Sequence, residues 1–303
     1  MARAKAPRIP WSTVVPDRLA ELHVHLEGTV RHATAAELAG RNGLPTPPPY
    51  DYHDLASFLA VYAHVSRCLV TSPDFERVIV EHAERMRDQN IEYAEVSFNP
   101  SLHPGDSWLG GIASGRRRAL DEFGVKVAWL VELVRGATSG VNQHALDIAL
   151  ATEGVVGIGL VGDESMSAAP LAPMVMQARQ AGLGFMPHAG QSGSSDVVRE
   201  AVDVLGATRI AHGVSAAGDE ALMRSLEQRH VCLCICPSSN KRIGLVPDYA
   251  RLAAHGVPLT VNTDDPAMVP TTLKAELELA TTRYGLNRQG LVAAAWAHRF
   301  QPK

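Results

Sequence analysis

The stretch Ala20-Glu21-Leu22-His23-Val24-His25 is a short apolar run that ends in a pair of histidines. Runs of this length are typical of buried β-strands. A His-x-His pair on a strand places both imidazoles on the same face. Alone, the pair is a weak indication of a metal site, so its interpretation depends on the rest of the chain.

Further short runs, rich in β-branched residues, recur along the chain between longer amphipathic stretches. The predicted strands are Ala20–His25, Glu92–Phe98, Lys126–Leu133, Val155–Leu160, Leu183–His188, Arg209–His212, Val231–Ile235 and Pro258–Thr263. The stretches between them predict helices. Asp74–Asn90, for example, carries apolar residues at helical spacing after Ser72 as the N-cap and Pro73 in the first turn.

Strands that alternate with helices predict βαβ units and a parallel sheet. Eight such units in 303 residues fit a closed barrel better than an open doubly wound sheet. We therefore predict an α/β fold, a (β/α)8 TIM-type barrel, with residues 1–303 as a single domain.

The connection after the first predicted strand is the longest in the chain. It contains Pro45-Thr46-Pro47-Pro48-Pro49, which is incompatible with a helix interior, followed by a predicted helix over Asp54–Arg67. An insertion at this point of a barrel lies over the mouth where barrel enzymes keep their chemistry. Residues 42–67 are therefore expected to form a lid-like insertion within the domain.

Composition narrows the classes of function. A net charge of −4 and 46% hydrophobic residues predict a globular protein without a nucleic-acid or membrane partner, and Arg116-Arg117-Arg118 is interpreted as a solvated helix face. The stretch Met1–Pro10 lacks the apolar core of a secretory signal. Cys232, Cys234 and Cys236 alternate along a predicted strand and are interpreted as small buried side chains. We expect a cytoplasmic protein.

Polar residues gather where the predicted strands end. The segments are His23-Val24-His25, Gly162-Asp163-Glu164, His188-Ala189-Gly190-Gln191, His212-Gly213, Ser238-Ser239-Asn240 and Thr263-Asp264-Asp265-Pro266. In a barrel, all the carboxyl ends of the strands converge on one mouth. Four histidines and an aspartate in such positions predict a metal site.

Three imidazoles and a carboxylate suit zinc or a similar divalent ion. Such a site keeps a position for water and lowers the pKa of that water towards neutrality. Binuclear barrel hydrolases often bridge two metals with a carboxylated lysine after the fourth strand. Residues 155–164 contain no lysine, so one zinc ion per chain is expected. The combined Cys-x-x-Cys and His-x-Glu pattern of cytidine-type deaminases is missing, because the sequence contains no Cys-x-x-Cys.

These segments, together with Glu21–Gly28, resemble the adenosine deaminase family in order and spacing, over about residues 16–300. The resemblance implies a hydrolytic deaminase that acts through zinc. The zinc ligands that it implies are His23, His25, His188 and Asp264.

The resemblance also implies roles around the substrate. His212 corresponds to the residue that orients and deprotonates the attacking water, and Asp265 to the residue that contacts purine N7. Gly162 corresponds to the backbone group near N3, and Glu27 to a carboxylate near the ribose. Phe58 corresponds to the lid helix that closes over the base, although ordinary core packing explains this side chain equally well.

Position 191 departs from the family pattern. Active members carry glutamate there, and its carboxylic acid gives a proton to ring N1 during attack at C6. Gln191 can donate a hydrogen bond but cannot supply a proton. Three explanations stay open: an introduced Glu→Gln change, a native residue suited to a substrate that needs no proton from this position, or a protein that binds nucleosides without turnover.

The sequence as a whole predicts a zinc-dependent hydrolase that displaces an amine from adenosine or a related amino-substituted heterocycle. Its predicted catalytic residues are His212, Gln191 and Asp265. The expected partner is a small-molecule purine nucleoside or a related heterocyclic amine. The alternatives are a non-catalytic, metal-holding nucleoside-binding protein and a phosphoesterase of the His-x-His kind, which usually needs two or three metals.

Overall fold

The strands of the structure are parallel and neighbour one another in chain order. The computed structural model describes residues 18–301. Its strands are β1 (Leu19–His25), β2 (Ile91–Phe98), β3 (Lys126–Val134), β4 (Val155–Val161), β5 (Gly184–Ala189), β6 (Arg209–His212), β7 (Cys232–Ile235) and β8 (Leu259–Val261). Each predicted boundary lies within two residues of the observed one, and the predicted (β/α)8 barrel is confirmed.

The barrel closes between β1 and the residues after β8. Val24 forms a parallel bridge with Asp264. The backbone N–H of His25 donates to Asp264 O (2.8 Å), and the N–H of Asp264 donates to His23 O (3.1 Å). Backbone pairing at this seam therefore brings the His-x-His pair beside Asp264.

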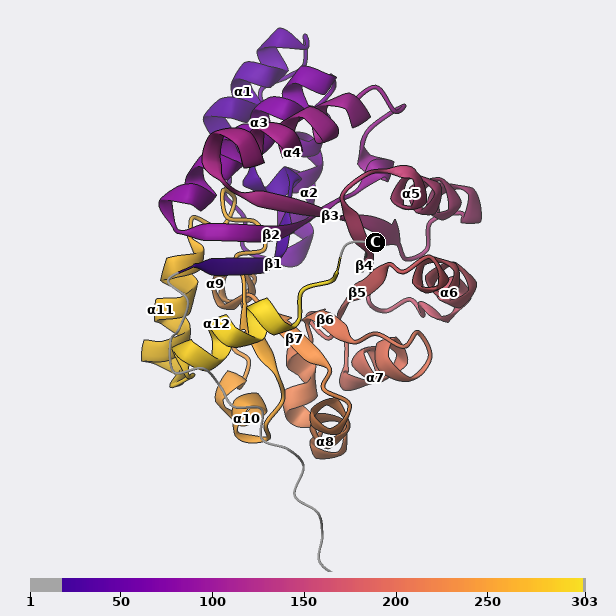
Figure 1. Ribbon diagram of the computed structural model, residues 1–303, viewed down its shortest axis with the longest axis vertical. Coiled ribbons are helices and arrows are strands. Elements are labelled where there is room, and N and C mark those ends of the chain that lie inside the picture. Colours follow the sequence, from indigo (N-terminus) through magenta and orange to yellow (C-terminus); the bar gives the residue numbers. More distant parts are fainter. Residues whose placement is uncertain (1–17, 302–303) are drawn as a thin grey trace, which may run out of the picture.

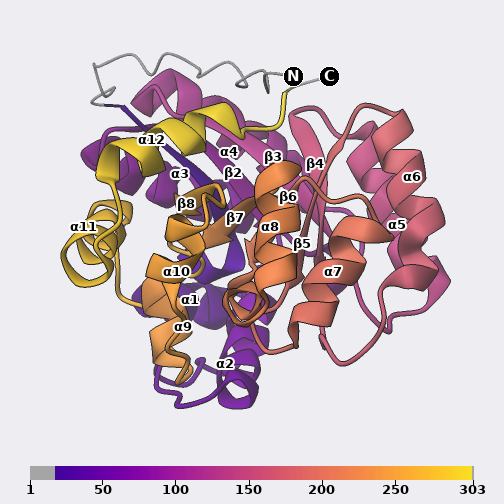
Figure 2. The same cartoon turned by 90° about the horizontal axis from the view of Figure 1, so that it is seen from below.

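Helices surround the strands, as Figure 1 shows. They are α1 (His32–Arg41), α2 (Leu55–Arg67), α3 (Ser72–Asp88), α4 (Leu109–Phe123), α5 (Ser139–Ala151), α6 (Ala172–Gln180), α7 (Ser195–Asp203), α8 (Glu220–Gln228), α9 (Pro237–Arg242), α10 (Tyr249–Ala254), α11 (Leu273–Tyr284) and α12 (Arg288–Ala297). Figure 2 shows α12 and α2 at opposite ends of the barrel. The start of β1 contacts α12, because Trp296 Nε1 donates to Arg18 O (2.9 Å), so α2 lies at the carboxyl ends of the strands.

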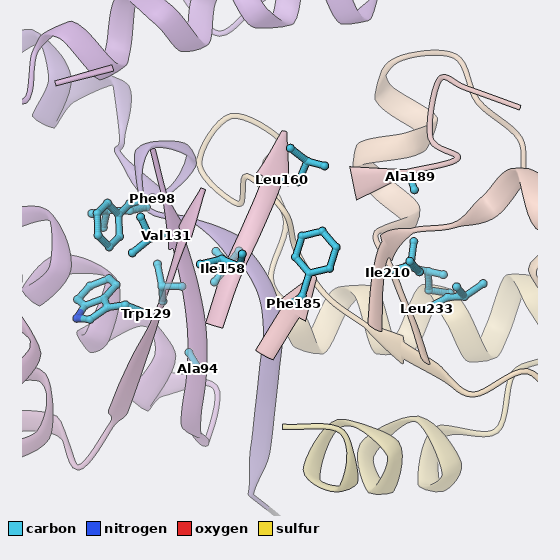
Figure 3. Close-up of a cluster of buried hydrophobic side chains, with 14 of the residues drawn as sticks. Ala94, Phe98, Trp129, Val131, Ile158, Leu160, Phe185, Ala189, Ile210 and Leu233 are labelled. Atoms are coloured by element: carbon cyan, nitrogen blue, oxygen red, sulfur yellow. The ribbon is translucent and has the colours of Figure 1, made fainter. Parts of the chain in front are cut away.

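Apolar side chains form two layers. The outer layer lies between strands and helices, and Figure 3 shows part of it, including Phe98, Trp129, Ile158, Phe185 and Leu233. The inner layer, inside the barrel, consists of Ala20, Leu22, Tyr93, Ala128, Leu130, Val156, Met186, Ala211 and Cys234. Because the strands are buried on both faces, apolar runs mark them in the sequence.

Capping residues set the starts of the two helices after the proline-rich segment. Asp54 is the N-cap of α2, and its carboxylate accepts from Ser57 N (2.8 Å). The predicted N-cap of α3 is wrong by one residue, because Thr71 and not Ser72 precedes that helix. The Asp74 carboxylate accepts from Thr71 N (2.7 Å), which completes a capping box at Thr71.

An ion pair closes the amino-terminal end of the barrel. Glu95 on β2 and Arg209 on β6 form a salt bridge in which both side chains are buried. Glu95 also accepts from the Tyr93 hydroxyl (3.0 Å) and from Phe300 N (2.7 Å). Arg209 donates to His298 O (2.9 Å), and its guanidinium lies 3.8 Å from the centroid of the Phe300 ring. The polar groups at this end therefore have partners.

The single domain predicted for residues 1–303 and the interpretation of Met1–Pro10 involve residues outside the described range, so both stay predictions. Within residues 18–301, no single helix is long and apolar enough to cross a membrane. By length and composition, α2 and α3 pass that test only as a pair, and the pair is bent by 120°.

Candidate active site

The predicted metal ligands meet at the carboxyl ends of the strands. His23 and His25 lie in β1, His188 lies in β5, and Asp264 follows β8. The Nε2 atoms of the three histidines lie 3.2–3.3 Å from one another. Asp264 Oδ1 lies 3.0 Å from His23 Nε2 and 3.3 Å from His25 Nε2. Zinc bonds of about 2.0–2.1 Å give a tetrahedral edge of about 3.3–3.4 Å, so these atoms are spaced like ligands of one ion.

The second ring nitrogen of each of these histidines faces an oxygen. The contacts are His25 Nδ1 to Glu132 Oε1 (3.1 Å), His188 Nδ1 to Leu160 O (3.2 Å) and His23 Nδ1 to Cys234 O (3.4 Å). Acceptors at Nδ1 favour the tautomer that leaves the Nε2 lone pair free. Lone pairs at this spacing repel one another unless a cation lies between them, so the residues fit a divalent metal ion.

The charges at the site also suit a cation. Burial alone would raise the pKa of Asp264, but His23 and other nearby histidines lower it well below its usual value. Ser239 Oγ donates to Asp264 Oδ2 (2.6 Å) and further stabilises the carboxylate. Against the effect of burial, the Glu132 charge and Asp264 raise the pKa of His25 well above its usual value. Asp264 and Glu132 therefore place negative charge beside His25, which suits a bound cation, whereas burial and the neighbouring histidines lower the pKa of His188 well below its usual value.

Backbone strain occurs at and beside the predicted ligands. His212, at the end of β6, and Asp264 both have a φ of 64°, in the left-handed region. Residues other than glycine rarely adopt this conformation, which costs about 1–3 kcal/mol. The side chains of the two residues approach each other, with His212 Nε2 3.7 Å from Asp264 Oδ2.

His212 lies beside the predicted ligands as a neutral imidazole. It is buried, its ring centroid lies 4.9 Å from that of His23, and it lines the cavity above the ligands. Burial lowers the pKa of His212 to about 3, although the Asp264 charge acts in the opposite direction. The imidazole is therefore neutral, which is the form that a general base needs, but a pKa of about 3 makes it a weak base.

Asp265 lines the cavity next to the ligands. Burial and the charge of Asp264 raise the pKa of Asp265 well above its usual value, so this carboxyl can donate a hydrogen bond. Among residues 18–301, its buried Oδ1 has no hydrogen-bond partner. A Cβ atom on Gly28 would lie 1.9 Å from this oxygen, so only glycine fits at position 28.

Gln191 lies in the loop after β5 and lines the cavity. Its Nε2 donates to Asn240 Oδ1 (3.2 Å), and Asn240 Nδ2 donates to the Tyr249 hydroxyl (2.9 Å). Gln191 Oε1 forms no hydrogen bond to any described residue. Gln191 therefore offers a bound molecule the acceptor Oε1 and the second N–H of its amide.

Glu164 holds the loop that carries Gln191. Its Oε2 accepts from the backbone N–H groups of Gly190 (2.8 Å) and Gly193 (2.8 Å), and its Oε1 accepts from Gln191 N (3.2 Å). Sequence analysis placed Glu164 in a strand-end segment without a role. The contacts that define its role come from the loop after β5, whereas Glu164 itself follows β4.

Glu132 was missed by the sequence analysis. It lies inside β3, is buried, and faces His25 Nδ1 at 3.1 Å. A carboxylate in this position orients a metal-binding imidazole. The signal was available, because a glutamate between Val131 and Leu133 interrupts an otherwise apolar strand.

A cavity of about 610 Å³ opens at the ligand cluster. Most of the predicted site residues line it, namely His25, Phe58, Gly162, His188, Gln191, His212, Asp264 and Asp265. From α2, Leu55, Ala56, Phe58, Leu59 and Ala63 contribute to the wall. The Phe58 ring packs against Tyr52 and Tyr62, with centroid distances of 5.1 and 5.7 Å. The segment 42–67 therefore contributes a wall of the cavity.

Glu27 does not line the cavity. Its Oε1 lies 3.0 Å from His103 Nε2 and accepts from Asn99 N (3.2 Å), and its Oε2 accepts from the Tyr62 hydroxyl (3.0 Å). Burial would raise the pKa of Glu27, but the hydrogen bond and charge of His103 lower it overall. The carboxylate adjoins the cavity through Tyr62 and Asn99, both of which line it.

Comparisons with known proteins identify a family and several similar proteins. The family model described as adenosine deaminase matches residues 18–297. An aminodeoxyfutalosine deaminase of Acidothermus cellulolyticus is 36% identical over 292 residues, which cover 86% of this chain and 81% of that protein. The solved structure of an adenine deaminase from Arthrobacter aurescens has a TM-score of 0.87 at 27% identity and covers 94% of both chains. That of a Burkholderia ambifaria amidohydrolase with bound Zn has a TM-score of 0.83 at 23% identity, covering 94% of this chain and 86% of that chain.

Proposed function

The chain belongs to the adenosine deaminase family, and from this premise we propose that it is a zinc-dependent hydrolase that removes the amino group from a 6-aminopurine or a related amino-substituted heterocycle. The relatives named above are a deaminase of aminodeoxyfutalosine and a deaminase of adenine. The substrate class that these names share is a small heterocyclic amine.

One observation carries the proposal. Donor atoms of His23, His25, His188 and Asp264 lie at the spacing of ligands of one ion, on the floor of a cavity that His212 and Asp265 also line. A donor set rich in imidazole favours zinc over magnesium or calcium. Residues 18–301 hold two groups of possible ligands, His23, His188, His212 and Asp264, and His25, Glu132 and His188. Because the two groups share His188, we assign one zinc ion per chain. When bound, zinc supplies Lewis-acid activation of a water molecule.

The residues around the cavity perform the proton transfers. His212 is neutral, so it takes a proton from the attacking water and passes it to the leaving amine. Asp265 contacts N7 of the purine, and the direction of its pKa shift favours the protonated form, which can donate a hydrogen bond there. Gly162 and Phe58 also line the cavity. We assign to them the contacts near purine N3 and over the ring that the family resemblance implies.

Gln191 lowers the rate for substrates that need a proton at N1. General acid catalysis is worth about 10²–10⁴-fold, or roughly 3–5.5 kcal/mol. The zinc ligands are unaffected, because the Gln191 amide contacts Asn240 and its backbone contacts Glu164. A protein that binds nucleosides without turnover is the second candidate, and Gln191 is the observation that favours it.

Ammonia release from adenine, adenosine and pterin-like amines by the zinc-loaded protein tests the proposal. We expect turnover that disappears in His212→Ala while zinc stays bound, because His212 is not a ligand in this assignment. Full zinc occupancy and tight nucleoside binding without turnover on any compound would instead establish the non-catalytic binder.

A further inference from the structure

The Glu27 carboxylate and the Tyr62 hydroxyl join the barrel to the α2 wall of the cavity. Building on the deaminase function proposed above, we propose that Glu27 is a positioning residue: it holds Tyr62, and through Tyr62 the α2 wall, in the place where that wall contacts the heterocycle. Glu27 then supports binding without touching the substrate, so its effect is the same for a free base and for a nucleoside.

Glu27 lies outside the cavity. Its side chain is fully buried and does not line the cavity wall. Three donors already use its two oxygens: Oε1 faces His103 Nε2 (3.0 Å) and accepts from Asn99 N (3.2 Å), and Oε2 accepts from the Tyr62 hydroxyl (3.0 Å). The carboxylate therefore needs no partner from a ligand, unlike Asp265, whose buried Oδ1 has no partner among residues 18–301.

The barrel side of this contact is fixed independently of α2. Glu27 follows β1, Asn99 follows β2, and His103 ends the short turn after Asn99. The His103 ring packs edge-to-face against Phe75 of α3, with a centroid distance of 4.8 Å. Both barrel-side partners of Glu27 thus belong to the turn after β2, and neither is part of α2.

The helix α2 has few other attachments. Its buried residues are Val61, Val65 and Ser66, whereas Leu55–Ala60 contains no buried residue. Among residues 18–301, the Tyr62 hydroxyl is the only side-chain group of α2 that hydrogen-bonds to a residue outside the segment 42–67. The hydrogen bond to Glu27 therefore lies where the packed half of the helix meets the half without buried residues.

Tyr62 passes this support to the residues beside the substrate. Its ring centroid lies 5.7 Å from that of Phe58 and 6.4 Å from that of His25. Phe58 is the residue to which we assigned the contact over the ring of the substrate. A tyrosine hydroxyl has one hydrogen to donate, and Glu27 receives it. The orientation of the Tyr62 ring, and of the Phe58 ring that packs on it, therefore depends on Glu27.

Hydrogen exchange tests the attachment of α2 directly. Tyr62→Phe removes the hydroxyl and keeps the ring. We expect the backbone amides of α2 to exchange at least about tenfold faster in this variant, because the helix loses its hydrogen bond to the barrel. Mass spectrometry of the zinc-loaded protein in deuterated water measures the rate.

The matched control is Tyr93→Phe. It removes a hydroxyl that donates to the buried Glu95 over the same 3.0 Å, at the other end of the barrel. Exchange in α2 should not change in this variant. Unchanged exchange in Tyr62→Phe, or an equal rise in the control, would overturn the proposal.

Binding of hypoxanthine and inosine separates this role from a direct contact with the ribose. The two compounds are the products that deamination of adenine and adenosine gives, and they differ only in the ribose. Glu27→Gln leaves one side-chain oxygen for three donors, so it weakens the same hydrogen bond that Tyr62→Phe removes. We expect each variant to raise Kd about tenfold for both compounds, and the protein with both changes to raise it no further.

Calorimetry on the zinc-loaded proteins measures these constants. A loss of affinity in Glu27→Gln that is confined to inosine, or losses that add when both changes are made, would overturn the proposal and leave the deaminase site intact. Zinc-loaded unaltered protein that binds neither compound would contradict the purine site and, with it, the role of α2 in binding.

Discussion

The two ends of the barrel differ in whether their buried polar groups have hydrogen-bond partners. At the amino-terminal end, Glu95 and Arg209 pair with each other and with surrounding donors and acceptors. At the carboxyl end, among residues 18–301, His212 Nδ1 and Asp265 Oδ1 are buried without hydrogen-bond partners. A left-handed φ occurs at both ends, at His212 and Asp264 at the carboxyl end and at Asn90 and His230 just before β2 and β7. Buried unpaired polar groups cost stability, and those of His212 and Asp265 belong to residues that line the cavity, so they mark a site whose partners arrive with a ligand.

Removing a ligand from the carboxyl end should have the largest effect on function. We expect Asp264→Ala to lose both zinc and turnover, because it removes a donor atom that lies within 3.3 Å of two imidazole nitrogens. Zinc content by elemental analysis and ammonia release are the measurements. Cys234→Ala is the control and should keep its zinc, because His23 faces the backbone oxygen of Cys234. Zinc loss in the cysteine variant would contradict the assignment.

Breaking the ion pair at the opposite end should reduce stability without affecting the metal. Arg209→Met leaves Glu95 buried without its cation, which costs about 3–5 kcal/mol in the free energy of unfolding. Denaturant unfolding measures this loss, and zinc per folded chain should not change. The matched control is Arg229→Met, which removes an exposed pair with Asp203 and should cost within about 1 kcal/mol. Similar losses in both variants would show that burial of the Arg209 pair contributes little.

Restoring the acid should raise turnover of weakly basic substrates. Gln191→Glu is expected to increase kcat for adenosine-type deamination by about 10²-fold, with little change in affinity, because the gained interaction belongs to the transition state. Steady-state kinetics and nucleoside binding measure the two quantities separately. A lower kcat in this variant would count against a missing general acid.

Weakening the support of one ligand should have the smallest effect. Glu132→Gln removes the charge that faces His25 Nδ1, and we expect zinc affinity to fall about 10–100-fold with the fold retained. Competition with a chelator measures the affinity. Glu122→Gln is the control, because Glu122 pairs with Arg118 on the surface of α4. Unchanged zinc affinity in Glu132→Gln would show that this carboxylate does not support the ligand.

The strands could be predicted because each is an apolar run that the barrel buries on both faces. The convergence of the predicted ligands followed from the same pattern, since residues at the carboxyl ends of the strands share one mouth. Glu132 could have been found as a carboxylate inside an apolar strand. The N-cap of α3 was missed by one residue because Thr71 and Ser72 are both capping residues, and the Asp74 side chain decides between them.

Contacts between residues that lie far apart in the sequence could not be predicted. The partners of Glu27 lie 35 residues away at Tyr62 and 76 residues away at His103, and no pattern in the sequence connects these positions. Similarly, Glu164 is separated by 27 residues from Gln191, whose loop it holds. Tertiary structure alone brings such groups together.

Zinc content and turnover measured on the same sample test the metal site most directly. Zinc-loaded protein should hold about one tightly bound ion per chain. As a chelator removes the zinc, ammonia release from a 6-aminopurine should fall in proportion to the zinc lost. Two tightly held metals per chain, or turnover that persists after the zinc has gone, would contradict a single zinc ion held by His23, His25, His188 and Asp264.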